Sequence, residues 1–189
     1  MGEEGIVKKF LFFSIASLLL LFITGCGLKE IKPRAIDEKN DKCVQCHMSV
    51  VDDQFATQLT LENGKTYTFD DIGCMVKWTR ENKAENVAAQ FVRDYESKEW
   101  ILLENAIYVY DQEIKTPMAY NVISFSDEQK AKDFAARMDA DVIASSKLYD
   151  HQWEVNNSMM MKMKEEMGSG AREHSHEEGA MDNTHNKDE

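Results

Sequence analysis

The residues that could do chemistry in this chain are concentrated in one short string, Cys43-Val44-Gln45-Cys46-His47-Met48. Two thiols that lie three residues apart can converge on one centre, and an imidazole and a thioether follow directly. Thiolates, thioethers and imidazoles are soft or borderline donors, a set that favours Cu(I), with zinc as the common competitor. The string therefore predicts a site that holds a soft metal ion and can release it.

The same string permits other interpretations, which the residues alone leave open. Cys43-x-x-Cys46-His47 is the attachment signature of a c-type haem, for which Met118 would be a second axial ligand. Two cysteines at this spacing also suit a thiol–disulfide redox pair, a structural disulfide or, with Cys74, a zinc site. Cytochrome c domains are mostly helical and thioredoxin-like sites follow a strand, and the sequence around the string predicts neither arrangement.

The N-terminus has the pattern of a lipoprotein signal. Lys8 and Lys9 precede an apolar run over 10–23, and a small residue, Gly25, stands directly before Cys26. The run is shorter than the roughly 20 residues of a membrane span. We expect cleavage after residue 25, with Cys26 as the lipidated first residue. The rest of the chain would then lie at the extracytoplasmic face of a bacterial cell membrane, held by the lipid.

Composition excludes some classes of function. The 189 residues carry a formal net charge of −12 and 43% hydrophobic residues, with a pI near 4.9. Nucleic-acid binding requires clustered Lys and Arg, so no nucleic-acid partner is expected. The sequence shows no paired carboxylates and no nucleophile–base pair of the kind that catalysis uses. We therefore expect that the protein is not an enzyme.

The periodicity of the chain predicts the elements that must position these side chains. Residues 55–61 and 66–69 flank Asn63-Gly64, a strong hairpin signal, and a helix capped by Asp70 or Asp71 follows to about 83. The pattern then repeats, with one helix opening at Ser126 in a capping box with Gln129. The predicted strands outside the hairpin are 87–92, 106–110, 121–125 and a weak last strand near 153–155.

This order indicates an α+β fold of two similar ββαβ halves with antiparallel sheet. We divide the chain into a signal peptide over 1–25, a polar tether over 26–42, a metal-binding domain over 43–155 and a tail over 156–189. The tail is rich in Met and His and has no residue that would build a core. We expect a helical piece over 157–167 and disorder beyond it. A metal-collecting arm, a partner contact and a plain solvated tail remain open as its role.

An ordered set of motifs over about 43–140, together with the lipobox, resembles the NosL family. The set comprises Cys43-x-x-Cys46-x-Met48, Phe69-Asp70-Asp71-Ile72-Gly73-Cys74-Met75, Ala106-x-Tyr108-Val109, Thr116-Pro117-Met118 and Ser126-Asp127. NosL proteins are lipoprotein copper chaperones for nitrous-oxide reductase in denitrification, and their fold has two ββαβ-type halves. The resemblance implies that Cys43, Cys46, Met48 and Met118 hold one Cu(I).

The resemblance also implies partners, namely nitrous-oxide reductase and an ABC-type membrane complex that assembles its copper centres. One position departs from the family pattern: a glycine often precedes the motif methionine, and here it is His47. His47 would be an additional ligand or an exposed side chain. Cys74 and Met75 are not general in the family, and their helical spacing is also that of a packed core face.

Overall fold

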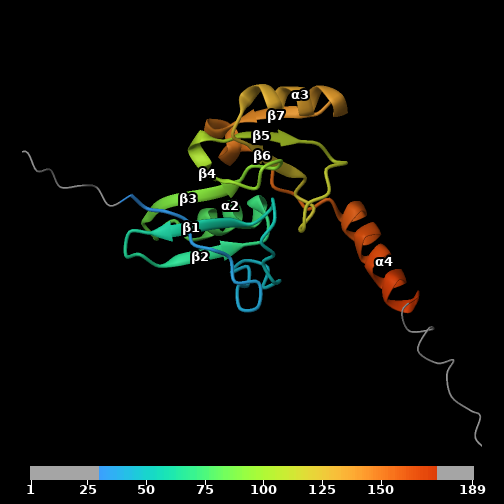
Figure 1. Ribbon diagram of the computed structural model, residues 1–189, viewed down its shortest axis with the longest axis horizontal. Helices are drawn as coiled ribbons and strands as arrows, with labels where there is room; N and C mark the ends of the chain where they lie inside the picture. The colour runs from blue at the N-terminus through green and yellow to red at the C-terminus, as the bar shows by residue number, and fades with distance from the viewer. Residues whose placement is uncertain (1–29, 174–189) are drawn as a thin grey trace, which may run out of the picture. The chain divides into compact units, whose positions relative to one another are not determined.

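The computed structural model describes residues 30–173, and side chains as far as Glu166. The compact unit that carries the fold begins at Pro33. As far as residue 173 it contains two antiparallel sheets and three α-helices, in which the order strand–strand–helix–strand occurs twice (Figure 1). The predicted α+β class with two ββαβ halves is confirmed.

The first half is a four-stranded sheet with one helix. The Asn63-Gly64 turn joins its first two strands as predicted, and Gly64 has the left-handed φ of +85° that such a turn requires. The strand order is β2-β1-β3-β4. Its elements are β1 (Thr57–Leu61), β2 (Thr66–Phe69), α2 (Ile72–Glu81), β3 (Val87–Arg93) and β4 (Trp100–Leu102).

The second half is a three-stranded sheet with one helix, and its strand order is β6-β5-β7. Short 3₁₀ turns, Leu103–Asn105 and Ser145–Asp150, precede β5 and follow β7. The elements are β5 (Ile107–Tyr110), β6 (Val122–Phe125), α3 (Glu128–Met138) and β7 (Asp141–Ala144).

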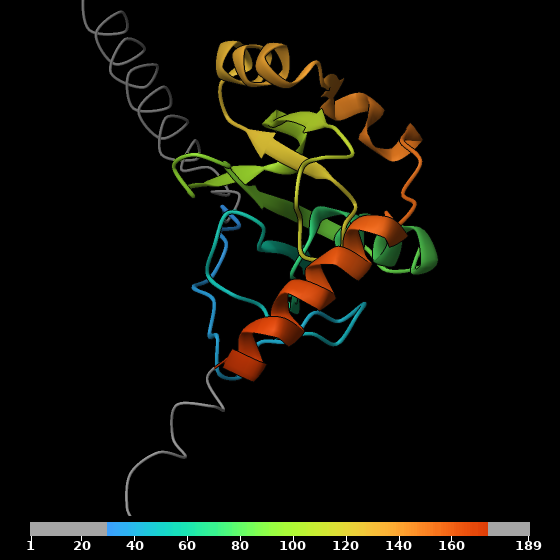
Figure 2. The ribbon, with the colours of Figure 1, turned by 90° about the vertical axis from the view of Figure 1, so that its right-hand side faces the viewer.

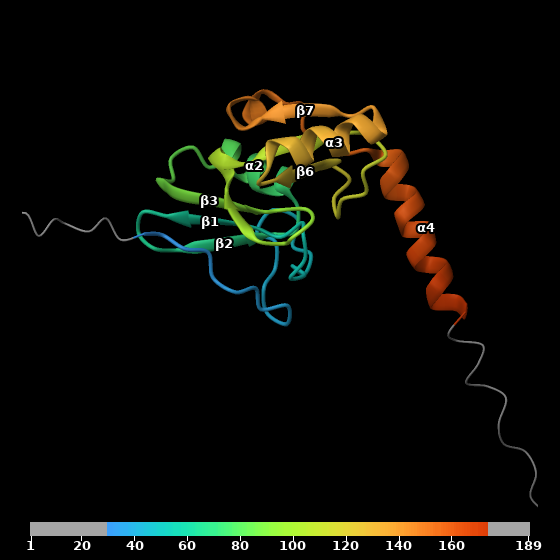
Figure 3. The same ribbon diagram turned by 45° about the horizontal axis from the view of Figure 1, so that its top comes forward.

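Alternation along the strands of the second sheet produces two cores, one on each face. On β5, Tyr108 enters the larger core with the first sheet and α2, whereas Val109 enters a smaller core with α3. Val122 and Ile123 divide in the same way on β6. Helix α2 contacts β1, β2 and β6 and so lies between the two sheets, whereas α3 covers the outer face of the second sheet (Figure 3).

Three details of the sequence prediction were wrong. The last strand is 141–144 and not 153–155, because Trp153 is used as a core side chain whose indole donates to the Leu148 carbonyl. The predicted capping box is absent: Asp127 caps α3, and Ser126 instead donates to the carboxylate of Asp94. Strand β4 was not predicted, and its three residues are too few to show a period.

The domain starts earlier than the sequence suggested, because part of the predicted tether packs on β1. The Arg34 backbone N–H donates to Gln58 Oε1 at 3.0 Å, and Gln58 Nε2 donates to the Arg34 carbonyl at 2.6 Å. Arg34 also forms a bidentate ion pair with Asp41. The fold therefore includes residues from about 33 onward.

Helix α4 (Asn157–Glu173) follows the second half and includes the helix that was predicted over 157–167. It continues over 168–173, where disorder was expected, so this part of the prediction was wrong. Figure 2 shows it as the long orange helix at the C-terminal end of the coloured chain. The tail beyond 173, including His174, His176 and His185, lies outside the described residues, as do the signal peptide and Cys26. Within residues 30–173 no helix has the length and apolar composition needed to span a membrane.

Candidate metal centre

The cysteine string forms a tight loop closed by backbone pairing. Lys42 and Ser49 form an antiparallel bridge, and the Cys43 N–H donates to the Met48 carbonyl at 2.8 Å. Between them the chain reverses direction, and His47 has a left-handed φ of +66°. This conformation favours glycine, although histidine adopts it more readily than most residues. The loop brings its two cysteines to the same side.

Four side chains from three segments meet at this loop. The sulfurs of Cys43, Cys46 and Cys74 and a carboxylate oxygen of Asp70 all lie within 4.8 Å of one another. Cys43 and Cys46 come from the loop, Asp70 from the residue after β2, and Cys74 from the first turn of α2. Antiparallel pairing and the strand–helix junction thus assemble a group of donors that is scattered in sequence.

The centre is mostly enclosed and opens on one side. Cys43, Cys74 and Asp70 are 0%, 1% and 5% exposed, whereas Cys46 is half-buried. The Cys46 thiol lies 3.2 and 3.3 Å from the two oxygens of Asp70, and the Cys46 N–H donates to Cys43 Sγ at 3.4 Å. Cys46 is therefore the thiol of this group that lies between the buried sulfurs and the solvent.

The electrostatics favour one shared negative charge among the thiols. Hydrogen bonds from Cys46 and Cys74 strongly lower the pKa of Cys43. The contact with Cys43 raises the pKa of Cys46 to about 12, and contacts with Cys43 and Cys46 raise the pKa of Cys74 far above its usual value. Burial raises the pKa of Asp70 to about 7, with a further contribution from the charge of Cys43. A bound cation would compensate this negative charge.

A second buried carboxylate connects the centre to the 116–120 loop. Asp71 Oδ1 accepts from the Gly73 N–H at 2.9 Å and caps α2, and Asp71 Oδ2 accepts from the Met118 N–H at 3.1 Å. Burial raises the pKa of Asp71 to about 6, against hydrogen bonds that include one from Thr116. Asp71 thus holds the Thr116-Pro117-Met118 segment beside the start of the helix that carries Cys74.

Close packing explains the glycine in this turn. A Cβ on Gly73 would lie 2.2 Å from the ring of Tyr120, so only glycine lets the 116–120 loop approach α2 so closely. Tyr120 is buried, and its ring stacks edge-on against Trp153 at 6.0 Å. The loop that carries Met118 is therefore fixed from both sides.

The comparisons with known proteins agree with this geometry. The sequence model of the NosL family matches residues 33–152, well over half of the chain. The chain belongs to the NosL family. Among solved structures, the copper chaperone NosL from Shewanella denitrificans is similar, with a TM-score of 0.57 and 17% identity over 64% of this chain and 98% of that one. No curated protein sequence matches.

NosL proteins are copper chaperones, which confirms the expectation that this chain is not an enzyme. The family match begins at residue 33, the point from which the chain packs on β1. The structural similarity to the Shewanella protein shows a shared fold. At this low sequence identity it does not identify individual ligands.

The residues predicted as ligands occupy different environments in this NosL protein. Cys43 and Cys46 lie together in the centre, and Met118 is half-buried against the same core. Met48 follows Cys46 in the loop with 49% of its surface exposed, and His47 is exposed. The sequence predicted Asp70 as a helix cap and left Cys74 open between a zinc ligand and a packed core residue. Cys74 is in fact both buried in the core and part of the thiol group.

The structure also bears on the alternative interpretations. Cys43, Cys46 and Cys74 are free thiols, so the structure forms no disulfide among them. Covalent haem attachment would need access to Cys43, whose side chain has no exposed surface and lies among other thiols. The surrounding domain is an α+β fold, in contrast to the helical domains of cytochromes c. The geometry therefore favours a compact soft-metal site.

Proposed function

We propose that this protein is a membrane-anchored, extracytoplasmic chaperone that binds Cu(I) and delivers it for assembly of the copper centres of nitrous-oxide reductase. The observation that carries the proposal is the convergence of three thiols and one carboxylate within 4.8 Å in a NosL fold. Sulfur donors in a site without a fixed high-coordination cage select a soft monovalent ion over harder competitors.

Cys43, Cys46 and Cys74 are the proposed anchoring ligands. They are neutral thiols in part, and binding of Cu(I) displaces the protons from the thiols that become ligands. Asp70 accepts a hydrogen bond from the Cys46 thiol in the free protein. Once this sulfur loses its proton and binds the metal, Asp70 would orient it as an outer partner by donating from its protonated carboxyl, which the raised pKa of about 7 allows. Met118, whose backbone N–H donates to Asp71, would supply a thioether from the 116–120 loop.

Met48 is the proposed exit ligand. Its side chain is 49% exposed and lies two residues after Cys46, the one half-buried thiol of the group. A thioether carries no charge and binds more weakly than a thiolate, so an ion that moves onto Met48 is ready for exchange with an incoming ligand. Delivery would thus proceed from buried thiols to an exposed thioether and on to the acceptor.

The proposal includes location and partners. Lipidation of Cys26 would hold the acidic domain at the outer face of the membrane, where an ABC-type assembly complex and the reductase would receive the ion. A labelled fatty acid supplied to cells should be incorporated into the wild type and not into the Cys26→Ser protein. A wild type that carries no label would contradict the lipid anchor.

Binding and delivery are tested with one set of proteins. In competition with a coloured Cu(I) chelator, the wild type should bind about one Cu(I), and the C43S/C46S protein should lose this binding. The loaded protein is then mixed with copper-free nitrous-oxide reductase, and copper in the reductase is measured with time. Met48→Leu should slow transfer without weakening the affinity, whereas Met161→Leu, at an exposed methionine elsewhere, should leave both unchanged. Transfer that is absent in the wild type contradicts the delivery role.

A further inference from the structure

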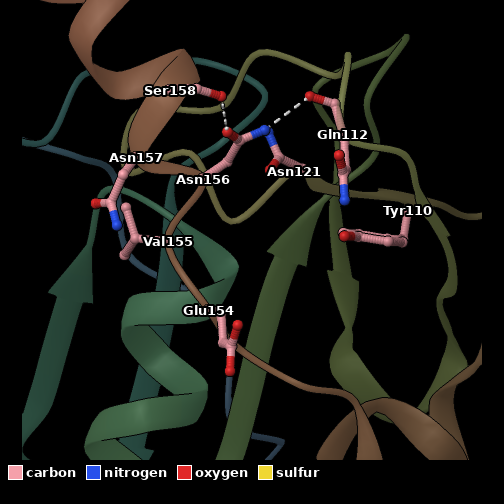
Figure 4. A pocket seen from close by; sticks show the side chains of 8 residues that line it. All are labelled: Tyr110, Gln112, Asn121, Glu154, Val155, Asn156, Asn157 and Ser158. Carbon is pink, nitrogen blue, oxygen red and sulfur yellow. Dashed lines mark hydrogen bonds between the residues drawn. The ribbon is translucent and has the colours of Figure 1, made fainter.

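The start of α4 is fixed on the domain by one asparagine. The Asn156 N–H donates to the Ala119 carbonyl at 2.9 Å, and its side-chain amide donates to the Gln112 carbonyl at 3.1 Å (Figure 4). Its Oδ1 accepts from the Ser158 hydroxyl at 2.8 Å and from the Met159 N–H at 3.2 Å, as in an N-cap. The first turn of the helix therefore has a defined position against the 112–121 segment.

A buried amide also places the first methionine sulfur of this helix. Asn121 is 2% exposed and has a left-handed φ of +63°. Its Nδ2 donates to the Ile114 carbonyl at 2.7 Å and to Met159 Sδ at 3.1 Å. A thioether sulfur has two lone pairs, so this hydrogen bond orients the sulfur and leaves one pair available.

The methionines of α4 differ in their surroundings. Met159, Met160 and Met163 are half-buried, whereas Met161 is 61% exposed. Met163 is four residues after Met159 and three after Met160, so the three side chains are neighbours on one helix face. Met159 and Met163 also line a cavity of about 290 Å³ between α4 and residues 112–115.

We propose that Met159 and Met163, with Met160 beside them, form a second metal site that takes a monovalent soft ion, Cu(I) or Ag(I), on thioether sulfurs alone. Side chains four residues apart on a helix can approach one ion from two sides, which suits the low coordination that such ions accept. Thioethers bind without losing a proton, and they discriminate against zinc and calcium. This site is separate from the thiol centre and weaker than it.

One loop lies between the two sites. Met118 at its middle is held by Asp71 beside the thiols, and Asn121 at its end holds Met159. The Asn121 N–H also donates to the Thr116 hydroxyl at 3.2 Å, which closes the loop on itself. An ion on α4 would therefore be bound next to the loop that reaches the thiol centre.

The test uses Ag(I) as the probe, because it resembles Cu(I) and does not change its oxidation state. In the full chain with all four cysteines replaced by serine, the thiol centre is absent, and about one Ag(I) should still bind in a calorimetric or equilibrium-dialysis titration. M159L/M163L should weaken this binding by at least about tenfold, since it removes two ligands. Met161→Leu is the matched control and should change the affinity less than about twofold.

A second measurement applies if the cysteine-free protein does not fold. Methionine methyl groups are labelled with ¹³C in the protein with intact cysteines, and Ag(I) is added beyond the first equivalent. The Met159 and Met163 resonances should shift with the second equivalent, and the Met161 resonance should not. Equal effects of M159L/M163L and Met161→Leu, uniform shifts, or binding that persists in M159L/M163L would overturn the proposal. Because the thiols are absent or already filled, such a result leaves the Cu(I) chaperone proposal intact.

Discussion

The two halves of the domain enter their helices in the same way, yet only one of these junctions carries chemistry. Strand β2 ends at Phe69 and β6 ends at Phe125, and in each case an aspartate two residues later caps the helix. Asp71 and Asp127 therefore occupy equivalent positions, as do Asp70 and Ser126, and Cys74 and Lys130. The two junctions share this order of strand end, capping aspartate and helix, although Asp71 accepts from the N–H of Gly73 and Asp127 from that of Lys130.

The difference lies in what covers each junction. In the first half, the cysteine loop and the 116–120 loop close over it, and Asp70, Asp71 and Cys74 are buried. In the second half, Ser126 and Lys130 face solvent. A capped helix start is therefore a common structural unit. The cover distinguishes the copy that we propose as a metal centre, because it excludes water and adds two thiols.

The largest effect should come from exchanging the residue that distinguishes the two helix starts. Cys74→Ser removes a proposed ligand and should lower the affinity for Cu(I) by at least about 100-fold, more than the usual loss of an outer partner. Lys130→Ser at the equivalent position should leave the affinity unchanged. Competition with a Cu(I) chelator measures both. If Cys74→Ser and the wild type bind Cu(I) with equal affinity, Cys74 is a packed core residue and not a ligand.

The second largest difference should come from replacing each capping aspartate by asparagine, which removes one acceptor oxygen. Asp71 accepts two backbone N–H groups on different oxygens, and an asparagine can satisfy only one of them. Asp71→Asn should cost about 1–3 kcal/mol of unfolding free energy, the cost of an unsatisfied buried donor, and lower Cu(I) affinity about tenfold. Asp127→Asn should be nearly neutral because asparagine caps a helix as well as aspartate. Chemical denaturation and chelator competition would show whether the two differ.

Asp94, which follows β3 in the first half, accepts hydrogen bonds from Ser126 in the second half. This contact predicts that the stability of the protein depends on pH. Burial acts to raise the pKa of Asp94, but hydrogen bonds from Ser97 and Ser126 outweigh it and lower the pKa to about 2. Because the pKa is lower in the folded state, the stabilisation is complete above about pH 4 and disappears as pH falls toward about 2, and it amounts to about 2 kcal/mol. Asp94→Asn should lose it. Denaturation at about pH 7 and about pH 2.5 should show a gap between the proteins that narrows in acid; a constant gap would refute the charge effect.

The smallest effect concerns backbone strain in the covering loop. His47→Gly relieves a left-handed conformation and should raise stability by up to about 1 kcal/mol. Asp139→Gly, at a left-handed residue after α3, should behave similarly. Because the His47 side chain is exposed and outside the thiol group, Cu(I) affinity should not change. A loss of affinity in His47→Gly alone would identify the imidazole as a ligand.

Local signals in the sequence were sufficient for most of the fold. The Asn63-Gly64 turn, the alternation around it and the acidic cap at Asp71 each act over a few residues, and each predicted the observed element. Strand β7 was missed because its exposed residues on an edge do not alternate clearly. Trp153 was assigned to a strand because an aromatic residue suits both a strand and a core.

The site was predicted only where its residues are adjacent in sequence. Cys43 and Cys46 were found by their spacing. Cys74 and Asp70 joined them because β2 pairs with β1 and the loop folds onto the start of α2, and no short-range pattern contains this contact. The clue was present in the Asp70-Asp71-Ile72-Gly73-Cys74 string, where a cap, a glycine and a thiol stand together, but its meaning depends on the loops that cover it.

X-ray absorption at the copper edge of the protein loaded with one equivalent of Cu(I) tests the central claim most directly. We predict a first shell dominated by sulfur, with a sulfur contribution that falls in Cys74→Ser and is unchanged in Lys130→Ser. A shell of nitrogen and oxygen, or a spectrum that C43S/C46S leaves unaltered, would contradict it.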